Sequence, residues 1–256
     1  MKVRLLPSSA GRQSQFQSLT SFIVDDRLAI DGGSLGFALA PSEIGSIRHV
    51  IVTHAHSDHT ASLPIYVAEA FPVLDAPITI YASSEVITTL RQHVFNDDVW
   101  PNFEKIRLLN NRAATIEFRE LRAGETVTIA AIEVTPVQVN HIVPTFGLLA
   151  RNEAAAVLFS ADTYITDEIW KLGREAEHLK AVFVDVSYPN EMKDLAAASK
   201  HLTPELLSAE LRKLNRDVEV YAVHIKPSNR EDVIRQLAAL NDSRVGVAEI
   251  DRVYEW

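Results

Sequence analysis

The feature that most constrains this chain is a dense cluster of metal-binding residue types in the stretch THAHSDHT. His54, His56, Asp58 and His59 all fall within six residues. Imidazole rings that are crowded and buried without partners lose hydrogen bonds, so such a cluster needs a compensating ligand. A polar turn with surface histidines is the alternative, but this density of His and Asp favours a set of metal ligands.

The cluster lies between an apolar run, RHVIVTH, and a stretch of helical character, LPIYVAEAF. A strand-to-helix junction is the usual location of a site in an α/β sheet. His54 and His56 are two residues apart, so in an extended chain their rings point the same way. Asp58 and His59 follow as the chain turns into the helix and can point to a second position. The spacing therefore predicts two metal ions, on the order of 3.5–4 Å apart as in two-metal hydrolytic sites.

Further ligands are expected at the ends of other apolar runs, where polar residues would meet at one rim of a sheet. His141 ends VTPVQVNH, Asp162 ends AVLFSAD and His224 ends VEVYAVH. Taken singly, each has a plain alternative: a histidine satisfied in the core or, for Asp162 before Thr163, a helix cap. The predicted first site comprises His54, His56 and His141. The predicted second site comprises Asp58, His59 and His224, with Asp162 bridging the two.

The type of metal follows from the available ligands. The chain has no cysteine, so thiolate sites and disulfides are impossible. Nitrogen and carboxylate ligands favour two Zn2+ ions, with Mn2+ or Fe2+ as alternatives. Each metal lowers the pKa of bound water towards about 7, and a hydroxide held between the ions would be the nucleophile.

Short β-rich runs and helix-period runs alternate along the 256 residues, without heptads or an internal repeat. SFIVDDRLAID and TVTIAAIEVTPVQV predict strands with hairpins, and TPELLSAELRKLN and NREDVIRQLAAL predict helices. The pattern predicts an α/β (α+β) fold with two sheets covered by helices, in one domain spanning 1–256. The segment 91–111 is aromatic and broken by Pro101, and we expect it to leave the core as an excursion or lid.

Charge and hydropathy narrow the possible partners. The net charge of −9 disfavours binding along a long nucleic acid and favours a small ligand. No apolar run reaches the roughly 18–20 residues of a membrane span. The stretch MKVRLLPSSAGRQSQ turns polar too early for a secretory signal. We therefore expect no membrane partner and a cytoplasmic location.

The motif His54-x-His56-x-Asp58-His59, followed at long intervals by the three other predicted ligands, resembles the metallo-β-lactamase superfamily. The resemblance covers essentially the whole chain and implies an αββα sandwich with the two-metal site at one rim. Asp31, in RLAIDGGS, resembles the acidic residue that supports the metal ligands in that family.

Within this superfamily, several stretches look like the class II 3′,5′-cyclic-nucleotide phosphodiesterases. They are HLTPE from His201, HIKP from His224, HVFNDDVWPN from His93, VSYPNEMKDLAAASKHLTP from Val186 and QSLTSFIVDDRLAIDGGSLG from Gln17. The superfamily also hosts lactamases, thioesterases, lactonases and nucleases, so the fold alone does not define the activity. The resemblance implies hydrolysis of cAMP or cGMP to nucleoside 5′-monophosphates by attack of a metal-bridging hydroxide.

The stretch HLTPE reads as a helix start, with Thr203 as N-cap and Pro204 at the first helical position. Free amides at a helix N-terminus suit a phosphate oxygen. His201 is predicted to hydrogen-bond a phosphoryl oxygen or to protonate the departing ribose oxygen; a metal-linked water held by Asp58 is the other candidate proton donor. A solvent-facing histidine near a cap is the alternative. Lys226, in HIKP, would add a cation beside the phosphate, or else is an ordinary surface lysine.

The excursion 91–111 would then form a wall for the base. His93, Asn96 and Trp100 are the candidate contacts in this segment, and Asn190 is a further candidate for ribose or base. An aromatic cluster of this kind also fits a local core or a contact between two copies of the chain, and the latter would make the protein a homodimer.

Other functions share the same predicted metal site. A ribonuclease Z-like nuclease is disfavoured by the net charge of −9 and by the lack of a Gly- and Pro-rich basic arm. Another small-molecule metallo-hydrolase, for thioesters or lactones, gives no reason for His201 before a helix start. A metal-dependent scaffold or nucleotide-sensing module would bind metal without turnover.

Overall fold

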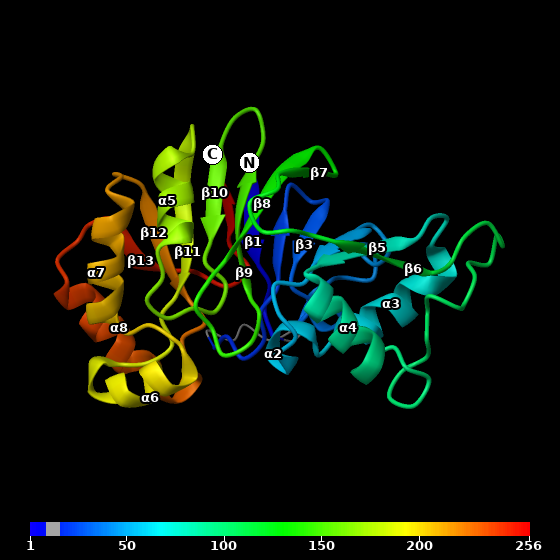
Figure 1. Cartoon of the computed structure of the whole chain (residues 1–256), viewed down its shortest axis with the longest axis horizontal. Helices are drawn as coiled ribbons and strands as arrows, with labels where there is room; N and C mark the ends of the chain where they lie inside the picture. The colour runs from blue at the N-terminus through cyan, green and yellow to red at the C-terminus, as the bar shows by residue number, and fades with distance from the viewer. Residues whose placement is uncertain (9–15) are drawn as a thin grey trace.

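The computed structural model describes residues 1–8 and 16–256, and the statements below refer to these residues. Their strands form two mixed sheets of seven strands each, which pack face to face (Figure 1). The first sheet consists, in spatial order, of β14 (Val253–Glu255), β1 (Lys2–Leu5), β2 (Phe22–Val24), β3 (Leu28–Ile30), β4 (His49–Ile51), β5 (Ile78–Ala82) and β6 (Ile116–Glu120). The second consists of β13 (Val245–Val247), β12 (Glu219–Val223), β11 (Leu179–Asp185), β10 (Ala156–Phe159), β9 (Phe146–Arg151), β8 (Ile132–Gln138) and β7 (Val127–Ile129).

Each sheet is antiparallel in one half and parallel in the other. Strands β14 to β3 are antiparallel neighbours, and β3 to β6 are parallel. In the second sheet β7 to β10 are antiparallel, and β10 to β13 are parallel. Parallel strands have their carboxyl ends at the same edge, so the residues that follow β3, β4, β10, β11 and β12 gather at the edge where sites form in such sheets.

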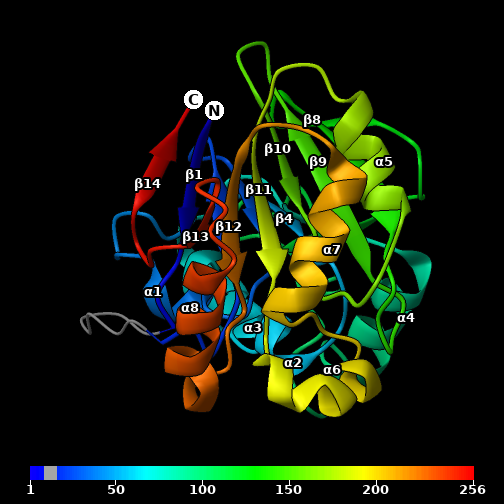
Figure 2. The ribbon, with the colours of Figure 1, turned by 90° about the vertical axis from the view of Figure 1, so that its left-hand side faces the viewer.

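Helices cover the outer face of each sheet (Figure 2). The first sheet is covered by α1 (Leu35–Ala38), α3 (Leu63–Ala70) and α4 (Ser84–His93), and the second by α5 (Glu168–Glu175), α7 (Pro204–Leu214) and α8 (Arg230–Ala239). The short helices α2 (Ser57–Thr60) and α6 (Lys193–Ser199) lie at the lower edge of the sandwich in Figure 1. Three 3-10 turns are present at η1 (Phe71–Val73), η2 (Asn190–Met192) and η3 (Pro227–Asn229). The predicted αββα sandwich is confirmed.

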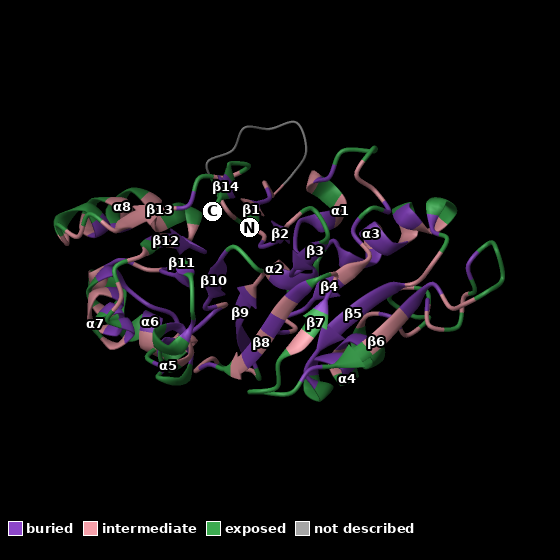
Figure 3. Ribbon diagram, turned by 90° about the horizontal axis from the view of Figure 1, so that it is seen from above, coloured by how far each residue is buried: buried purple, intermediate pink, exposed green. Residues whose placement is uncertain are grey.

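The two-residue period of the strands separates an inter-sheet core from the cores beneath the helices. In β11, Phe183 faces the other sheet, whereas Val182 and Val184 face the helices. The ring of Phe183 stacks on Phe159 with centroids 5.4 Å apart and meets Phe22 of the first sheet at 5.3 Å. Figure 3 shows the strands largely buried and the exposed residues concentrated on helices and loops. The aromatic inter-sheet core therefore fixes the relative position of the two sheets.

Several local features differ from the sequence-based expectation. Residues 91–93 of the predicted excursion form the last turn of α4, and the irregular segment begins at Val94. Neither α5, whose sequence contains Gly173, nor α6, which has Leu195 as its only large apolar residue, was predicted from the sequence. Residues 9–15 of the predicted non-secretory N-terminal stretch lie outside the described residues. Within the described part of the chain, no helix combines the length and apolar character needed to span a membrane.

Candidate metal centre

The HAHSDH cluster follows β4 at the edge of the first sheet and runs into α2: His56 is the N-cap residue of α2, and Asp58 and His59 lie within this helix. A close backbone approach shapes this junction. A Cβ on Gly33 would lie 2.0 Å from the backbone oxygen of Asp58, so only glycine fits there. Thr20 donates its backbone N–H to the same oxygen at 2.8 Å. The junction buries His54 completely and leaves Asp58 partly accessible.

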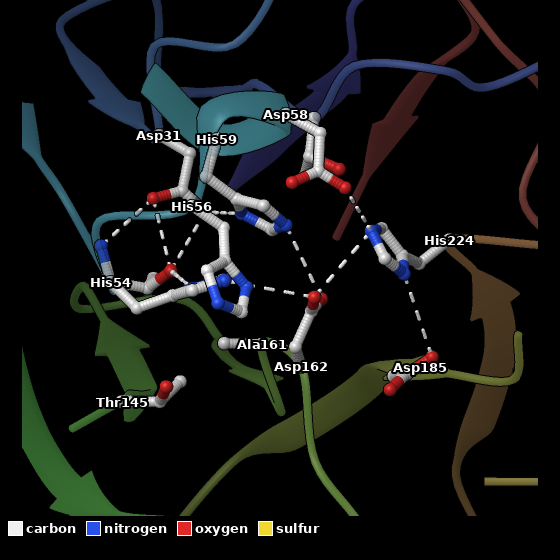
Figure 4. A network of polar contacts seen from close by, with 12 residues as sticks. Asp31, His54, His56, Asp58, His59, Thr145, Ala161, Asp162, Asp185 and His224 are labelled. Atoms are coloured by element: carbon white, nitrogen blue, oxygen red, sulfur yellow. Dashed lines mark hydrogen bonds and ion pairs between the residues drawn. The ribbon is translucent and has the colours of Figure 1, made fainter. Parts of the chain in front are cut away.

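Side chains from both sheets point toward Asp162, as Figure 4 shows. Oδ2 of Asp162 lies 3.7 Å from His54 Nε2 and 3.9 Å from His141 Nε2. The same oxygen lies 3.5 Å from His224 Nε2, and Oδ1 lies 3.3 Å from His59 Nε2. Asp162 therefore occupies the centre of the cluster. It does not cap the following helix, because that position is taken by another aspartate at the start of α5.

Three groups of possible ligand atoms share this aspartate: two contain the ligands predicted from the sequence, and the third consists of Asp162, Asp185, His201 and His224. The first group consists of His54, His56, His141 and Asp162, and the second of Asp58, His59, Asp162 and His224. Within each group the ligand atoms lie within 4.8 Å of one another. The structure thus brings together all seven residues that the sequence predicts as ligands, in the same two sets.

Two buried nitrogen atoms show that this cluster fits metal ions. Nε2 of His54 and Nε2 of His59 are buried and have no hydrogen-bond partner in the described part of the structure. Their other nitrogens are held, because His59 Nδ1 lies 2.7 Å from Asp31 Oδ2 and His54 Nδ1 lies 3.1 Å from Thr53 Oγ1. An imidazole with one nitrogen fixed and the other free is typical of ligating histidines. Clustered His and Asp residues of this kind suit divalent metal ions.

Burial and neighbouring charges shift the pKa values within the cluster. Burial, together with the nearby His59, holds the pKa of His54 well below its ordinary value. Burial also acts to lower the pKa of His59, but Asp162 and Asp31 raise it well above the ordinary value. Burial acts to raise the pKa of Asp162, yet His224 and His59 hold it well below the usual range. The carboxylates are therefore anionic and attract cations to this point.

Asp185 lies directly behind the cluster and was missing from the sequence-based candidates. It ends β11, is fully buried, and its Oδ2 lies 2.6 Å from His201 Nδ1. Its Oδ1 accepts a hydrogen bond of 2.7 Å from Ser187 Oγ, which lies 3.0 Å from His224 Nδ1. Burial acts to raise the pKa of Asp185, but His201 and the hydrogen bonds from both histidines hold it at about 2. The sequence did contain a signal for Asp185. In AVFVDVS the apolar run is followed by Asp185, just as the run in AVLFSAD is followed by Asp162.

His201 lies against both ligand groups. Its ring centroid is 5.1 Å from that of His141 and 5.3 Å from that of His224. The side chain is 8% exposed, which excludes the solvent-facing alternative. The preceding residue, Lys200, has a left-handed backbone with φ of 59°, and its carbonyl oxygen lies 3.1 Å from His141 Nδ1. Lys200 Nζ also donates to Asn140 Oδ1 at 2.8 Å, so the segment that presents His201 also orients His141.

The start of α7 has the predicted backbone but not the predicted free amides. Thr203 is the N-cap and accepts a hydrogen bond from the backbone N–H of Leu206, with Pro204 in the first turn. The N–H of Glu205 donates to Asn190 Oδ1 at 2.9 Å, and Pro204 has no N–H. The expectation that these amides are free for a phosphate is therefore wrong. Thr203 and Asn190 line an open groove of about 800 Å³. Residues of α6 and α8 line the same groove.

Lys226 lies at the accessible side of the second ligand group. Its Nζ is 3.6 Å from Asp58 Oδ2 and 3.4 Å from His224 Nε2. The side chain is 31% exposed. Its ammonium group is therefore part of the site rather than an isolated surface charge.

The segment after α4 lies apart from the cluster, beyond β6 and α4 in Figure 1. Asn96 Oδ1 accepts hydrogen bonds from two backbone amides of its own loop. Trp100 packs into the core beneath the helices of the first sheet, Phe95 is fully buried, and His93 is exposed at the end of α4. Within the described structure these residues do not contact the cluster. The aromatic side chains serve the local core instead, so this segment does not form a wall of the site.

Comparisons with known proteins agree with this geometry. Residues 34–225 match the family model described as "Beta-lactamase superfamily domain". A probable 3′,5′-cyclic-nucleotide phosphodiesterase of Yersinia pestis is 29% identical over 206 residues, which cover 72% of this chain. The matched part of the chain covers 58% of the length of this relative and 65% of the length of the second curated relative. Both shares are less than two thirds.

Solved structures share the fold over nearly the full chain. Unliganded yeast PDE1 superposes with a TM-score of 0.79 at 18% identity, covering 98% of each chain. The short form of human tRNase Z superposes with a TM-score of 0.66 at 15% identity, covering 100% of this chain and 99% of that one. At these identities the likeness concerns the fold alone.

Proposed function

Because the chain belongs to the metallo-β-lactamase superfamily, we propose that it is a two-metal phosphodiesterase that converts 3′,5′-cyclic nucleotides, cAMP or cGMP, to nucleoside 5′-monophosphates. The observation that carries the proposal is the His201–Asp185 pair beside both ligand groups. Cleavage of a phosphodiester produces an alkoxide leaving group, which needs a proton donor at this place. The similarity to a relative named as a probable cyclic-nucleotide phosphodiesterase supports the substrate class.

Seven residues would hold two divalent ions. The first ion would be bound by His54, His56 and His141, and the second by Asp58, His59 and His224, with Asp162 bridging. The nitrogen and carboxylate donors favour Zn2+, with Mn2+ and Fe2+ as alternatives. When bound, two such ions would supply a nucleophilic hydroxide at neutral pH and offset the charge of the phosphodiester. Asp31 and Thr53 keep His59 and His54 oriented, because each contacts the Nδ1 atom of its histidine.

His201 would protonate the departing 3′ oxygen. Its Nδ1–H donates to Asp185, so Nε2 is the nitrogen that faces the substrate. Hydrolysis adds one water across the P–O3′ bond: the hydroxyl group joins phosphorus, and the 3′ oxygen leaves with the proton from His201. The remaining proton of that water restores His201. Asp185 stabilises the imidazolium form that His201 has before it gives up this proton and again after it regains one.

Other side chains would bind the substrate. Lys226 places a cation beside Asp58, where a nonbridging phosphate oxygen would approach. Asp58, the more accessible of the two site aspartates beside His224, would also hold a water for proton transfer. Thr203 and Asn190, which line the neighbouring groove, would contact the nucleoside through a hydroxyl proton and an amide nitrogen.

A ribonuclease Z-like nuclease is the second candidate, because human tRNase Z shares the fold and the same histidine would serve its chemistry. The net charge of −9 disfavours it, since a tRNA presents many phosphates.

The test is turnover of cAMP and cGMP by zinc-loaded protein, with 5′- and 3′-monophosphates separated by chromatography. We expect metal-dependent formation of the 5′ product. His201→Asn should lower kcat by roughly 10²-fold or more, with unchanged metal content. The matched control is His178→Asn, at an exposed histidine outside the site. Absence of product in a sample with two ions per chain would contradict the cyclic-nucleotide proposal, and cleavage of a tRNA precursor would then support the nuclease.

A further inference from the structure

His224 has an uncommon backbone conformation. Its φ of 60° lies in the left-handed region, which residues other than glycine seldom adopt. The residue directly follows β12, and its Nε2 lies 3.1 Å from Asp58 Oδ2 and 3.5 Å from Asp162 Oδ2. Such a conformation persists only where the surrounding structure holds it.

Two side chains lie beside the main-chain groups of His224. Ser187 Oγ lies 3.1 Å from its carbonyl oxygen. On the other side, the backbone N–H of His224 donates to Gln17 Oε1 at 2.8 Å. Gln17 is 207 positions away in the sequence, in the segment that leads into β2. Its side chain supplies the acceptor that the strand end does not provide.

The same glutamine also connects to the loop that carries Asp58. Gln17 Nε2 donates to Thr20 Oγ1 at 3.2 Å, and the backbone N–H of Thr20 donates to the backbone oxygen of Asp58 at 2.8 Å. One amide therefore links His224 of the second sheet to Asp58 of the first. Its oxygen meets a donor and its nitrogen meets an acceptor, so a single orientation satisfies both.

We propose that Gln17 is a positioning residue for the second metal ion, because it fixes the main chain of His224 and the separation of His224 from Asp58. This inference rests on the two-metal site of the proposed function. Groups that orient metal ligands commonly contribute 10- to 100-fold to metal affinity. Gln17 makes no hydrogen bond to His54, His56 or His141, so its loss should weaken the second ion and spare the first.

The experiment is a titration of metal-free protein with Zn2+ in competition with a chromophoric chelator, which reports both affinities without substrate. We expect two ions in the wild-type protein. Gln17→Met, similar in size but without the hydrogen bonds, should weaken the second ion by roughly tenfold or more and change the first by less than about twofold. Gln92→Met, at an exposed position of α4, is the matched control and should bind both ions normally.

A second variant separates the two hydrogen bonds. Gln17→Glu keeps an oxygen acceptor for the N–H of His224, so its second-ion affinity should remain within about threefold of wild type. A second-ion affinity of Gln17→Met equal to wild type overturns the inference and leaves the proposed function standing. A wild-type protein that binds fewer than two ions overturns both. Circular dichroism checks folding, and Gln17→Asn, whose side chain is one methylene shorter, replaces the methionine variant if that variant is misfolded.

Discussion

Asp185 connects the two histidines on which the proposed chemistry depends. It accepts from His201 Nδ1 directly, and Ser187 joins it to His224 Nδ1. Its Oδ2 also accepts the backbone N–H of Thr163 at 3.1 Å. These contacts place a hydrogen on Nδ1 of both rings and direct Nε2 to the site, where Nε2 of His224 would bind a metal ion and Nε2 of His201 would carry the second proton of an imidazolium.

The first prediction concerns this carboxylate. Asp185→Asn keeps the shape but replaces one acceptor oxygen by an N–H group, so His201 loses its charged partner and its preferred tautomer. We expect kcat for cAMP to fall by roughly 10²- to 10⁴-fold in steady-state assays. Asp98→Asn, at an exposed position after α4, serves as the control and should leave kcat unchanged. An Asp185→Asn protein with wild-type kcat would remove the basis for the His201–Asp185 pair.

At the level of elements, α5 and α7 are joined by a buried carboxylate. Glu210 on α7 is 2% exposed, and its Oε2 accepts from Trp170 Nε1 at 2.7 Å and from the N–H of Thr166 at 3.0 Å. Its Oε1 lies 2.7 Å from Nζ of Lys213, whose side chain is 31% exposed. Thr166 lies four residues after Asp162, so this contact supports the loop that carries the central aspartate.

The second prediction is that Glu210→Ala lowers the free energy of unfolding by about 3 kcal/mol. Two buried N–H donors lose their partner, and the half-exposed Lys213 contributes little because water screens it. Urea unfolding followed by circular dichroism measures the change. Glu205→Ala, exposed in the first turn of the same helix, should cost less than about 1 kcal/mol. Equal losses in the two variants would show that the buried contact does not stabilise the α5–α7 pair.

At the level of the whole molecule, the two halves of the metal centre come from different sheets. His54 and His59 follow β4 of the first sheet, whereas Asp162 and His224 follow β10 and β12 of the second. Ions bound between them would therefore link the sheets at one edge, while the aromatic core around Phe183 links them in the interior. Metal binding should consequently contribute to global stability.

The third prediction is that removal of metal by a chelator lowers Tm by about 10 °C. Ions at roughly 1,000 times their Kd add about 4 kcal/mol, and in a protein of this size each kcal/mol shifts Tm by about 2–4 °C. Differential scanning calorimetry measures the shift. Added Zn2+ should restore Tm, whereas Mg2+ should not, because Mg2+ prefers oxygen ligands to imidazole nitrogen. An unchanged Tm in a sample shown to have lost its metal would contradict a structural role for the ions.

Features that depend on short spacing were predictable from the sequence. The strand-to-helix junction with its candidate ligands, the N-cap at Thr203 and two helix-covered sheets follow from periodicity, capping and the HxHxDH motif, which are local patterns. The αββα sandwich itself was implied by the resemblance to a known family. The convergence of the distant candidate ligands His141, Asp162 and His224 was also predictable, since strand ends in such a fold meet at one edge.

The hydrogen bonds between loops far apart in sequence could not be predicted, because they form only when the two sheets pack together. The tertiary structure places Gln17 against His224 and gives the amide of Glu205 to Asn190, and it directs the aromatic segment after α4 into the core rather than to the site. Each of these outcomes depends on which donors, acceptors and apolar surfaces meet once both sheets have packed. Local sequence patterns do not predict these contacts, because a buried polar group bonds to whichever partner the packed chain brings within hydrogen-bond distance.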